Sequence, residues 1–492
     1  MDEMKPARKQ RLSLGCLQLG CVLLVCLLEL FFMSPVGRQH GEAWAGVNHL
    51  LAVPGAAFLL LAMARGGNKP GKAMGALSIA MLLWFGCVQF FRAIRGMEQL
   101  LPGEITCFYA LALPMAWAME DGQRQWGLKA LTLTFLAESL ALTVLGLSLR
   151  FGFLPEAYAG GVRWDGARLL ELFHPNNCAV MLMLGIGICL GLCCRSKKVW
   201  FQAILVVLAL AQFGVQIMNH GRTGTVATCL LVGGILFCAI RKTGWKRAPL
   251  AMAAAVGVMV MMYLGAQGLY SLHESNLTKA ALQAVQERTE VTAETTAETV
   301  PETIPEVITE TTAEVITEAA AETKPTLSYL PQVKEDGTLD TTSVQKDLRQ
   351  DLLNLNGRTV IWKAAIQGVK GDVKLLVSGT DAPETILAEN GVSFALHTHN
   401  SFLEVLYTLG LPGLLIALAV TLLALRGAVL MLWRNEDLWK SAVAMLALCL
   451  LACGMLEPYL FVSGSNQNYI TLFFLTLAGY LHQWTVEERK AR

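Results

Sequence analysis

Charged residues are scarce in this sequence. Asp, Glu, Lys and Arg make up 16% of its 492 residues, whereas soluble domains carry roughly 25%. Hydrophobic residues make up 54%, and apolar runs of about 18 to 25 residues recur, which is the length a helix needs to cross a bilayer. The sequence therefore predicts an all-α polytopic membrane protein with the lipid bilayer as its main surroundings.

Several functional motifs are also missing. The sequence has no Walker phosphate loop, no GxGxxG after a strand and no basic patch, so we expect no nucleotide cofactor and no nucleic-acid partner. None of the thirteen cysteines lies in the long polar segment 271–398, and most lie inside apolar runs. This distribution argues against a disulfide framework and favours cysteines that pack as small apolar residues.

About twelve membrane spans are expected, with one large extracytoplasmic loop before the tenth. The predicted spans are 13–33, 44–64, 73–91, 103–119, 127–149, 176–194, 199–218, 224–240, 248–270, 405–433, 438–456 and 466–484. This pattern divides the chain into helices 1–9 within residues 1–270, the loop 271–398, and helices 10–12 within 399–492. No small-residue cleavage site follows the first apolar run, so we expect this run to be a retained membrane span rather than a cleaved signal peptide.

Lysine and arginine set the expected orientation. They concentrate in the N-terminal segment and in alternate loops, so the positive-inside rule places both termini in the cytoplasm. The histidines sort the opposite way, since only His482 falls at the inner end. We therefore expect the polar chemistry on the extracytoplasmic face.

The large outer loop has two parts. Within residues 289–324 a glutamate recurs at every fourth position from Glu294 onward among threonines and prolines, which opposes a helix and favours a disordered acidic tether. Residues 356–370 place apolar side chains on one face, which predicts a short amphipathic helix on the membrane surface or over the bundle, with Arg358 at its start.

The densest polar motif is His397–Gly413, where the loop meets the tenth span. Ser401 and Glu404 have the spacing of a capping box, so a helix is expected to begin near Ser401 with His399 just outside its first turn. An imidazole there could act as a general base near neutral pH. Alternatively, His399 could simply cap the helix, or it could bind zinc together with histidines from other loops. Because those histidines are scattered over separate loops, the sequence argues against a metal site.

Other polar groups precede or follow spans at the predicted outer face. Arg222 and Arg358 could clamp a diphosphate, because a guanidinium forks onto phosphate oxygens, or could simply extend toward the interface. Glu457 ends a span and could hold an arginine or orient a ligand group. Further candidates at the outer starts of spans are His174, Asn176 and His220.

The order of these motifs matches a known pattern. The run His399-Asn400-Ser401-Phe402-Leu403-Glu404, followed by Leu409-Gly410-Leu411-Pro412-Gly413, resembles the signature of the O-antigen ligase and polymerase superfamily. The segment around Arg222 resembles the family's Ser-Arg-Gly motif, Pro175-Asn176 its Pro-Asn motif, and Arg358 with Trp362 the arginine and tryptophan of its large outer loop.

The resemblance implies a metal-independent glycosyltransferase of the bacterial plasma membrane. It would move a glycan from an undecaprenyl-diphosphate carrier to a glycan, lipid, wall-polymer or protein acceptor. Arg222 and Arg358 would bind the diphosphate, His399 would activate the acceptor hydroxyl, and Asn400 and Glu404 would orient His399 or cap its helix. The alternatives are a transporter or flippase for a lipid-linked or anionic solute, and a scaffolding envelope protein that binds through its tether.

Overall fold

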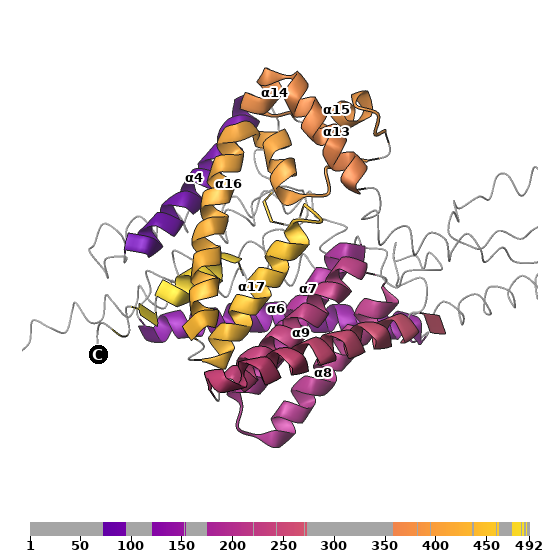
Figure 1. Ribbon diagram of the computed structural model, residues 1–492, viewed down its shortest axis with the longest axis vertical. Coiled ribbons are helices and arrows are strands. Elements are labelled where there is room, and N and C mark those ends of the chain that lie inside the picture. Colours follow the sequence, from indigo (N-terminus) through magenta and orange to yellow (C-terminus); the bar gives the residue numbers. More distant parts are fainter. Residues whose placement is uncertain are drawn as a thin grey trace, which may run out of the picture.

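A computed structural model gives the structure of the protein (Figure 1). It describes residues 72–94, 121–151, 153, 175–219, 221–242, 244–269, 271–272, 358–380, 382–393, 395–434, 437–458, 460–461, 475–483, 485–486 and 489. Helices and their connecting turns account for all of these segments, and none of them contains a strand. The all-α prediction is thus confirmed for the described part of the chain.

The long described helices overlap predicted spans, although α6 begins at Asp121, ahead of the predicted span 127–149. They are α4 (Lys72–Ile94), α6 (Asp121–Arg150), α7 (Pro175–Arg195), α8 (Val199–Met218), α9 (Arg222–Arg241), the 3₁₀ turn η2 (Trp245–Arg247), a helix at Ala248–Leu269, α13 (Arg358–Gly371), α14 (Val373–Ser378), α15 (Pro383–Glu389), α16 (Ser401–Arg434) and α17 (Leu438–Gly454). A last helical segment covers residues 475–483.

Five of the described helices are long and apolar enough to cross a membrane. They contain the windows Cys178–Arg195, Val199–Met218, Thr223–Arg241, Ala248–Leu269 and Ser401–Arg434. The predicted spans 13–33, 44–64 and 103–119 and the tether 289–324 lie outside the described residues. The total of twelve spans therefore stays a prediction.

Helix α7 lies at the centre of the bundle. Its residues from Cys178 to Cys189 are buried on every side, and it packs against α6, α8, α9 and α17 (Figure 1). A helix that is apolar all round is stable only when other elements surround it. The helix Ala248–Leu269, in contrast, is mostly exposed.

Polar side chains join these helices inside the apolar bundle. Two glutamines one turn apart on α8 provide the links: Gln212 Oε1 accepts from Ser139 Oγ of α6 at 2.8 Å, and Gln216 Nε2 donates to Ala179 O of α7 at 2.9 Å. Gln216 Oε1 also accepts from Thr228 Oγ1 of α9 at 3.0 Å. Buried polar groups must be paired in this way, so the four helices are held in one register.

Close helix contact at these links depends on glycine. A Cβ atom at Gly185 of α7 would overlap both Gln212 Oε1 and Ser139 Oγ. We expect Gly185→Ala to lower the thermal unfolding temperature of the detergent-purified protein, because overpacking typically costs about 1–3 kcal/mol. Gly214→Ala on α8 is the matched control, since a Cβ there meets nothing within 4 Å; an equal loss in both variants would contradict this packing.

Helices α13, α14 and α15 form a small cap over the N-terminal end of α16 (Figure 1). The cap has its own apolar core, whose buried members are Ile361, Ala364, Ala365, Leu375, Leu387, Val392, Ala395 and Tyr407. The predicted amphipathic segment 356–370 therefore corresponds to α13, and its apolar face covers other helices of the cap rather than lying alone on the membrane. Two neighbouring short helices, α14 and α15, were not predicted.

Helix α16 is broken at Gly410, where φ is +63° and ψ is −167°. A Cβ atom there would overlap the backbone of Val377, and one at Gly379 would lie 2.6 Å from the carbonyl carbon of Thr408. Backbone therefore packs directly on backbone where α14 meets α16, which only glycine permits. The first nine residues of α16 consequently belong to the cap, and the predicted span 405–433 starts inside them.

Candidate functional site

His399 lies in a turn that the buried residue Glu404 holds in place. Glu404 Oε2 accepts hydrogen bonds from the backbone nitrogen and the hydroxyl of Thr398, both at 2.8 Å. His399 itself has a φ of +50°, and no other described residue except glycine has a positive φ. Such a backbone conformation is uncommon and persists where the surroundings fix it. The turn is thus built to present the His399 ring in one direction.

The cap of α16 differs from the predicted capping box. Asn400, not Ser401, is the capping residue, because its Oδ1 accepts from the nitrogens of Phe402 and Leu403 at 2.9 and 3.1 Å. Glu404 reaches back to Thr398, as described above, rather than to the nitrogen of the capping residue. The predicted start of the helix at Ser401 agrees with the structure, whereas the predicted pairing of side chains was wrong.

The motif His399-Asn400-Ser401 binds the end of α17 through three successive side chains. His399 Nδ1 lies 2.9 Å from Glu457 Oε2, Asn400 Nδ2 donates to Met455 O at 2.8 Å, and Ser401 Oγ donates to Glu457 O at 2.8 Å. The start of α16 and the end of α17 therefore form one rigid corner.

Glu457 lies at the centre of this corner and uses both carboxylate oxygens. Its Oε1 accepts from Arg358 Nη2 of α13, and its Oε2 contacts the His399 ring. Its side chain is only 2% exposed, against 26% for His399. One buried carboxylate thus joins three elements that are far apart in the sequence: α13, the turn before α16 and the turn after α17.

The charge state of Glu457 determines how the imidazole is oriented. Burial alone would raise the pKa of the Glu457 carboxyl, but the hydrogen bond from His399 and the Arg358 charge together hold that pKa below its ordinary value. An ionised carboxylate only accepts hydrogen bonds, so Nδ1 of His399 carries the proton. In the neutral ring, Nε2 is then left as the proton acceptor.

Two buried donors beside this corner have no hydrogen-bond partner among the described residues. They are Arg358 Nε and Trp362 Nε1, which lie one helical turn apart on α13. Buried donors are normally paired, and each exception asks for an explanation such as a bound ligand.

The remaining predicted residues stand as follows. Arg222 lies in the first turn of α9 and Asn176 in the first turn of α7, but the structure does not describe their side chains. His174 and His220 lie outside the described residues altogether.

The direction of α7 follows from its contact with α17. Gly191 near the end of α7 faces Trp439 at the start of α17, so these two helices run antiparallel. Helix α7 therefore begins at the end of the bundle where Glu457 lies.

The same reasoning applies to α9. Gly234 contacts Met445 of α17, and Arg241 at the end of α9 donates to the carbonyls of Leu432 and Trp433 at the end of α16. Helix α9 therefore begins, at Arg222, on the side of the bundle that carries the corner. No group of three or more His, Cys, Asp or Glu side chains with metal-binding geometry occurs among the described residues.

Residues 204–418 match the family model described as O-antigen ligase. The chain carries an O-antigen ligase domain. The match supports the resemblance to the O-antigen ligase and polymerase superfamily that the motifs around His399 predicted. No curated protein matches the chain. The matched residues include most of α8, α9, the helix Ala248–Leu269, the cap and the first half of α16, and thus Arg222, Arg358 and His399.

The ligase domain and the apolar helices together indicate a bacterial multi-pass membrane protein of the glycosyltransferase type.

Glu457 lies beyond the matched residues, although its side chain contacts two residues within them, Arg358 and His399. Sequence analysis predicted only that Glu457 could hold an arginine or orient a ligand group. Thr398, which fixes the turn together with Glu404, was not predicted at all.

Proposed function

We propose that this protein transfers a glycan from an undecaprenyl-diphosphate carrier to an acceptor hydroxyl on the outer face of the membrane. The observation that carries the proposal is the carboxylate of Glu457, which joins the His399 imidazole to the Arg358 guanidinium. A proton acceptor and a phosphate-binding cation thereby lie beside each other, as transfer from a diphosphate requires.

His399 is the proposed general base. Its Nε2 removes the proton of the acceptor hydroxyl while the hydroxyl oxygen attacks the anomeric carbon of the donor sugar. The bond between that carbon and the phosphate oxygen breaks, and the diphosphate leaves with the electron pair. Glu457 keeps the ring in the required tautomer and stabilises the imidazolium that forms, as an orienting carboxylate does in other base-catalysed transfers. No metal or cofactor takes part in this scheme.

Arg358 is the proposed cation for the departing diphosphate. The leaving group gains negative charge as the bond breaks, so a fixed guanidinium stabilises the transition state more than the bound donor. Arg358 Nε and Trp362 Nε1, the two donors without partners, would bind phosphate or sugar oxygens. Arg222, which begins α9 on the same side of the bundle, would supply the second cation.

The remaining polar residues would act on the substrate or on its approach. Asn400 and Glu404 hold the turn that carries His399, whereas His174, Asn176 and His220 would bind donor or acceptor from the starts of α7 and α9. The acceptor is a glycan, lipid, wall polymer or protein that presents a hydroxyl. The catalytic end of the bundle would face away from the cytoplasm, and both termini of the chain would lie on the cytoplasmic side of the membrane.

Arg358→Gln gives a direct test with a matched control. Purified protein is incubated with a carrier-linked oligosaccharide, and the new glycosidic products are separated by length. We expect Arg358→Gln to reduce transfer by about a hundredfold or more, as loss of one preorganised donor does. Lys363→Gln, which removes an exposed cation from the same helix, should leave transfer unchanged. Movement of the substrate across vesicles without any new glycosidic bond would instead support a transporter.

A further inference from the structure

The histidine that begins the motif 397–413 has no part in the proposed reaction. Its ring nevertheless lies beside the base, since the centroids of the His397 and His399 rings are 4.0 Å apart and the rings are inclined by 56°. The backbone nitrogen of His399 also donates to His397 Nδ1 at 3.3 Å. The His397 side chain therefore contacts both the backbone and the ring of the residue that is proposed to take the proton.

The hydrogen bond to the backbone determines how His397 uses its Nδ1 atom. A backbone N–H can only donate, so Nδ1 of His397 must present a lone pair. The ring of His399 has the opposite arrangement, because its own Nδ1 carries a proton toward the Glu457 carboxylate at 2.9 Å. The two neighbouring imidazoles thus have different tasks: one accepts from the backbone, and the other donates to a carboxylate.

The bond from His399 to His397 holds an uncommon backbone conformation. His399 has a φ of +50°, and a residue with a Cβ atom stays in this left-handed region only where its surroundings fix it. Two successive amides anchor the turn: the nitrogen of Thr398 donates to Glu404 at 2.8 Å, and the nitrogen of His399 donates to His397. Without the second anchor, the backbone at His399 would be free to relax and to turn Nε2 away from its present direction.

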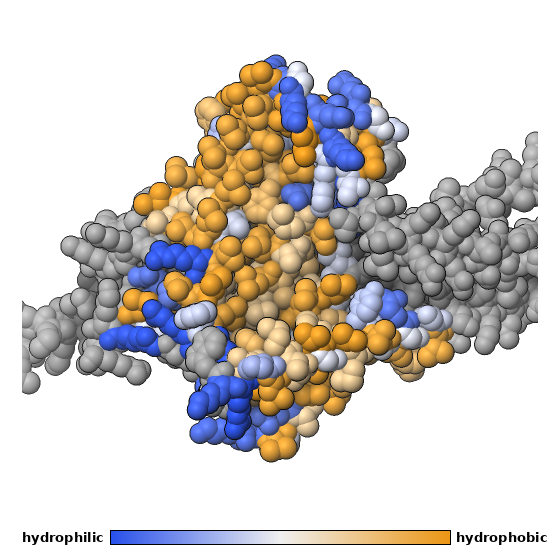
Figure 2. Space-filling view, viewed as in Figure 1, coloured by the Kyte–Doolittle hydropathy of each residue, from blue (hydrophilic) through white to orange (hydrophobic). Residues whose placement is uncertain are grey.

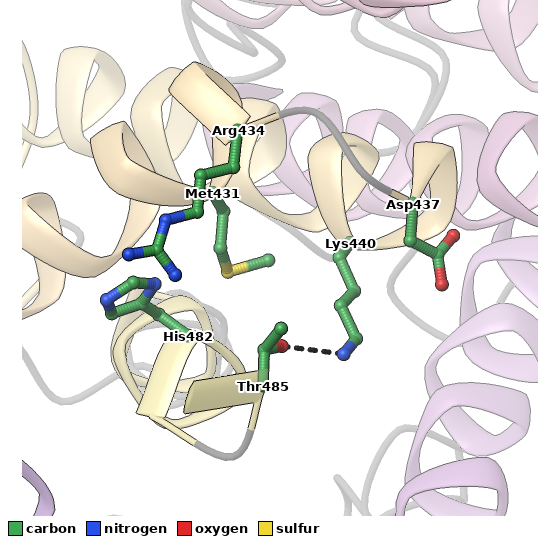
Figure 3. A pocket seen from close by; sticks show the side chains of 6 residues that line it. All are labelled: Met431, Arg434, Asp437, Lys440, His482 and Thr485. Atoms are coloured by element: carbon green, nitrogen blue, oxygen red, sulfur yellow. Dashed lines mark hydrogen bonds between the residues drawn. The ribbon is translucent and has the colours of Figure 1, made fainter. Parts of the chain in front are cut away.

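The other histidine whose side chain the structure describes, His482, has different surroundings. It lies near the end of α16 that is remote from the cap, beside the Arg434 guanidinium, and the carboxylate of Asp437 is turned away from it (Figure 3). A general base needs a neighbour that stabilises the cation it becomes. Glu457 can do this for His399, whereas Arg434 cannot do it for His482.

The rings of His397 and His399 lie outside the apolar middle of the bundle. Leu415, Leu418 and Leu422 are exposed along α16. Figure 2 shows hydrophobic side chains over the middle of the bundle, between hydrophilic groups at the cap and at the opposite end. Both histidines precede α16 and are partly exposed, so the two rings are accessible at the cap end of the bundle.

We propose that His397 is a positioning residue for the base His399, a role that rests on the proposed transfer reaction. Its Nδ1 accepts the amide of His399, keeps the turn in the left-handed conformation and thereby aims His399 Nε2 at the acceptor hydroxyl. A small misplacement of a reacting group can cost about a hundredfold in rate. Loss of the bond should therefore lower kcat and leave the affinity for the donor, which Arg358 would bind, unchanged.

Two substitutions separate the acceptor atom from the ring. His397→Asn keeps an acceptor, because Oδ1 of asparagine is as many bonds from Cα as Nδ1 of histidine, and asparagine side chains commonly accept from the amide two residues further on. His397→Phe keeps an aromatic ring beside His399 but has no acceptor. Ser393→Ala, which truncates an exposed side chain of the same loop, is the matched control.

Hydrogen exchange of the full-length protein in detergent, resolved to single amides by mass spectrometry with fragmentation, measures the bond without any substrate. The amide of His399 should exchange about fivefold faster in His397→Phe than in wild type, as the loss of one hydrogen bond predicts. It should exchange at the wild-type rate in His397→Asn and Ser393→Ala. The amide of Thr398, which Glu404 holds, is the internal reference and should stay protected in every variant.

Transfer from a carrier-linked oligosaccharide then gives kcat and the KM for the donor. We expect His397→Phe to lower kcat about a hundredfold with an unchanged KM. His397→Asn should restore kcat to the wild-type value, although it lacks a ring. Thermal unfolding in detergent confirms that the compared variants are folded.

Four outcomes would overturn the proposal. Equal exchange of the His399 amide in wild type and His397→Phe would exclude the bond, and faster exchange of the Thr398 amide as well would indicate a general loosening of the loop. Normal kcat in His397→Phe, or an equal loss in His397→Asn, would show that the acceptor atom does not position the base. A wild-type protein with the expected exchange but no transfer would overturn the proposed function, and the role of His397 with it, while the bond itself would stand.

Discussion

Replacing His399 with alanine is expected to reduce glycan transfer by about 10²–10⁴-fold, the usual contribution of a positioned base. The protein should still insert and fold, because Asn400 and Ser401 keep their bonds to the end of α17. Product formation from a carrier-linked oligosaccharide measures the loss, and thermal unfolding in detergent measures the fold. Full activity in the variant would rule out His399 as the base.

A second substitution separates the chemistry of the ring from its packing. Glutamine at position 399 has an amide that can still donate to Glu457 but cannot take up a proton at neutral pH. We therefore expect His399→Gln to be as inactive as His399→Ala, while its unfolding temperature stays near that of wild type. Gln367→Ala, which truncates an exposed side chain on α13, is the control with normal transfer.

Glu457→Gln is expected to damage both activity and stability. Removing one partner of a buried ion pair leaves the other charge uncompensated, which typically costs about 3–5 kcal/mol. Arg358 is itself buried and would lose its carboxylate partner. The His399 ring would also lose the acceptor that fixes its tautomer, so transfer should fall about a hundredfold or more.

The double variant Arg358→Gln/Glu457→Gln distinguishes these two effects. It removes the guanidinium together with the carboxylate, so no buried charge stays unpaired and stability should recover relative to Glu457→Gln alone. Glycan transfer should not recover, because the base still lacks its orienting carboxylate. Recovery of transfer in the double variant would contradict the proposed roles of both Arg358 and Glu457.

The same carboxylate predicts a response to acid. Its pKa is lowered in the folded protein, so the folded state favours the ionised form over the protonated one. That contribution to stability is present above the ordinary carboxyl pKa of about 4.3. It is lost as the pH falls through the lowered value. Glu457→Gln should therefore unfold at a temperature that depends less on pH in this acidic range than wild type.

Apolar periodicity in the sequence was enough to predict the long helices. The boundaries of α7, α8 and α9 agree with the predicted spans to within two residues, because long apolar runs leave few alternatives in a membrane. The polar turn before α16 and the start of α13 at Arg358 were also found from local patterns. Helices α14 and α15 are only six and seven residues long, too short to show a clear period.

The contacts within the site were harder to predict. Glu457 is 58 residues from His399 and 99 residues from Arg358 in the sequence, and no local pattern shows that one carboxylate serves both. The cap of α16 illustrates a smaller failure, since Asn400 and Ser401 are both good capping residues. The structure gives the cap to Asn400 because the Ser401 hydroxyl is bonded to Glu457 O and Leu460 N.

The break at Gly410 also sets the height of the reacting groups above the bilayer. From Leu411 to Arg434 the second part of α16 is about 36 Å long at 1.5 Å per residue, and this alone covers the roughly 30 Å of hydrocarbon. In the proposed arrangement, the nine residues before the break, and His399 ahead of them, are left on the aqueous side. The polyprenyl tail of the proposed carrier would then stay in the lipid while its phosphates and sugars reach the imidazole.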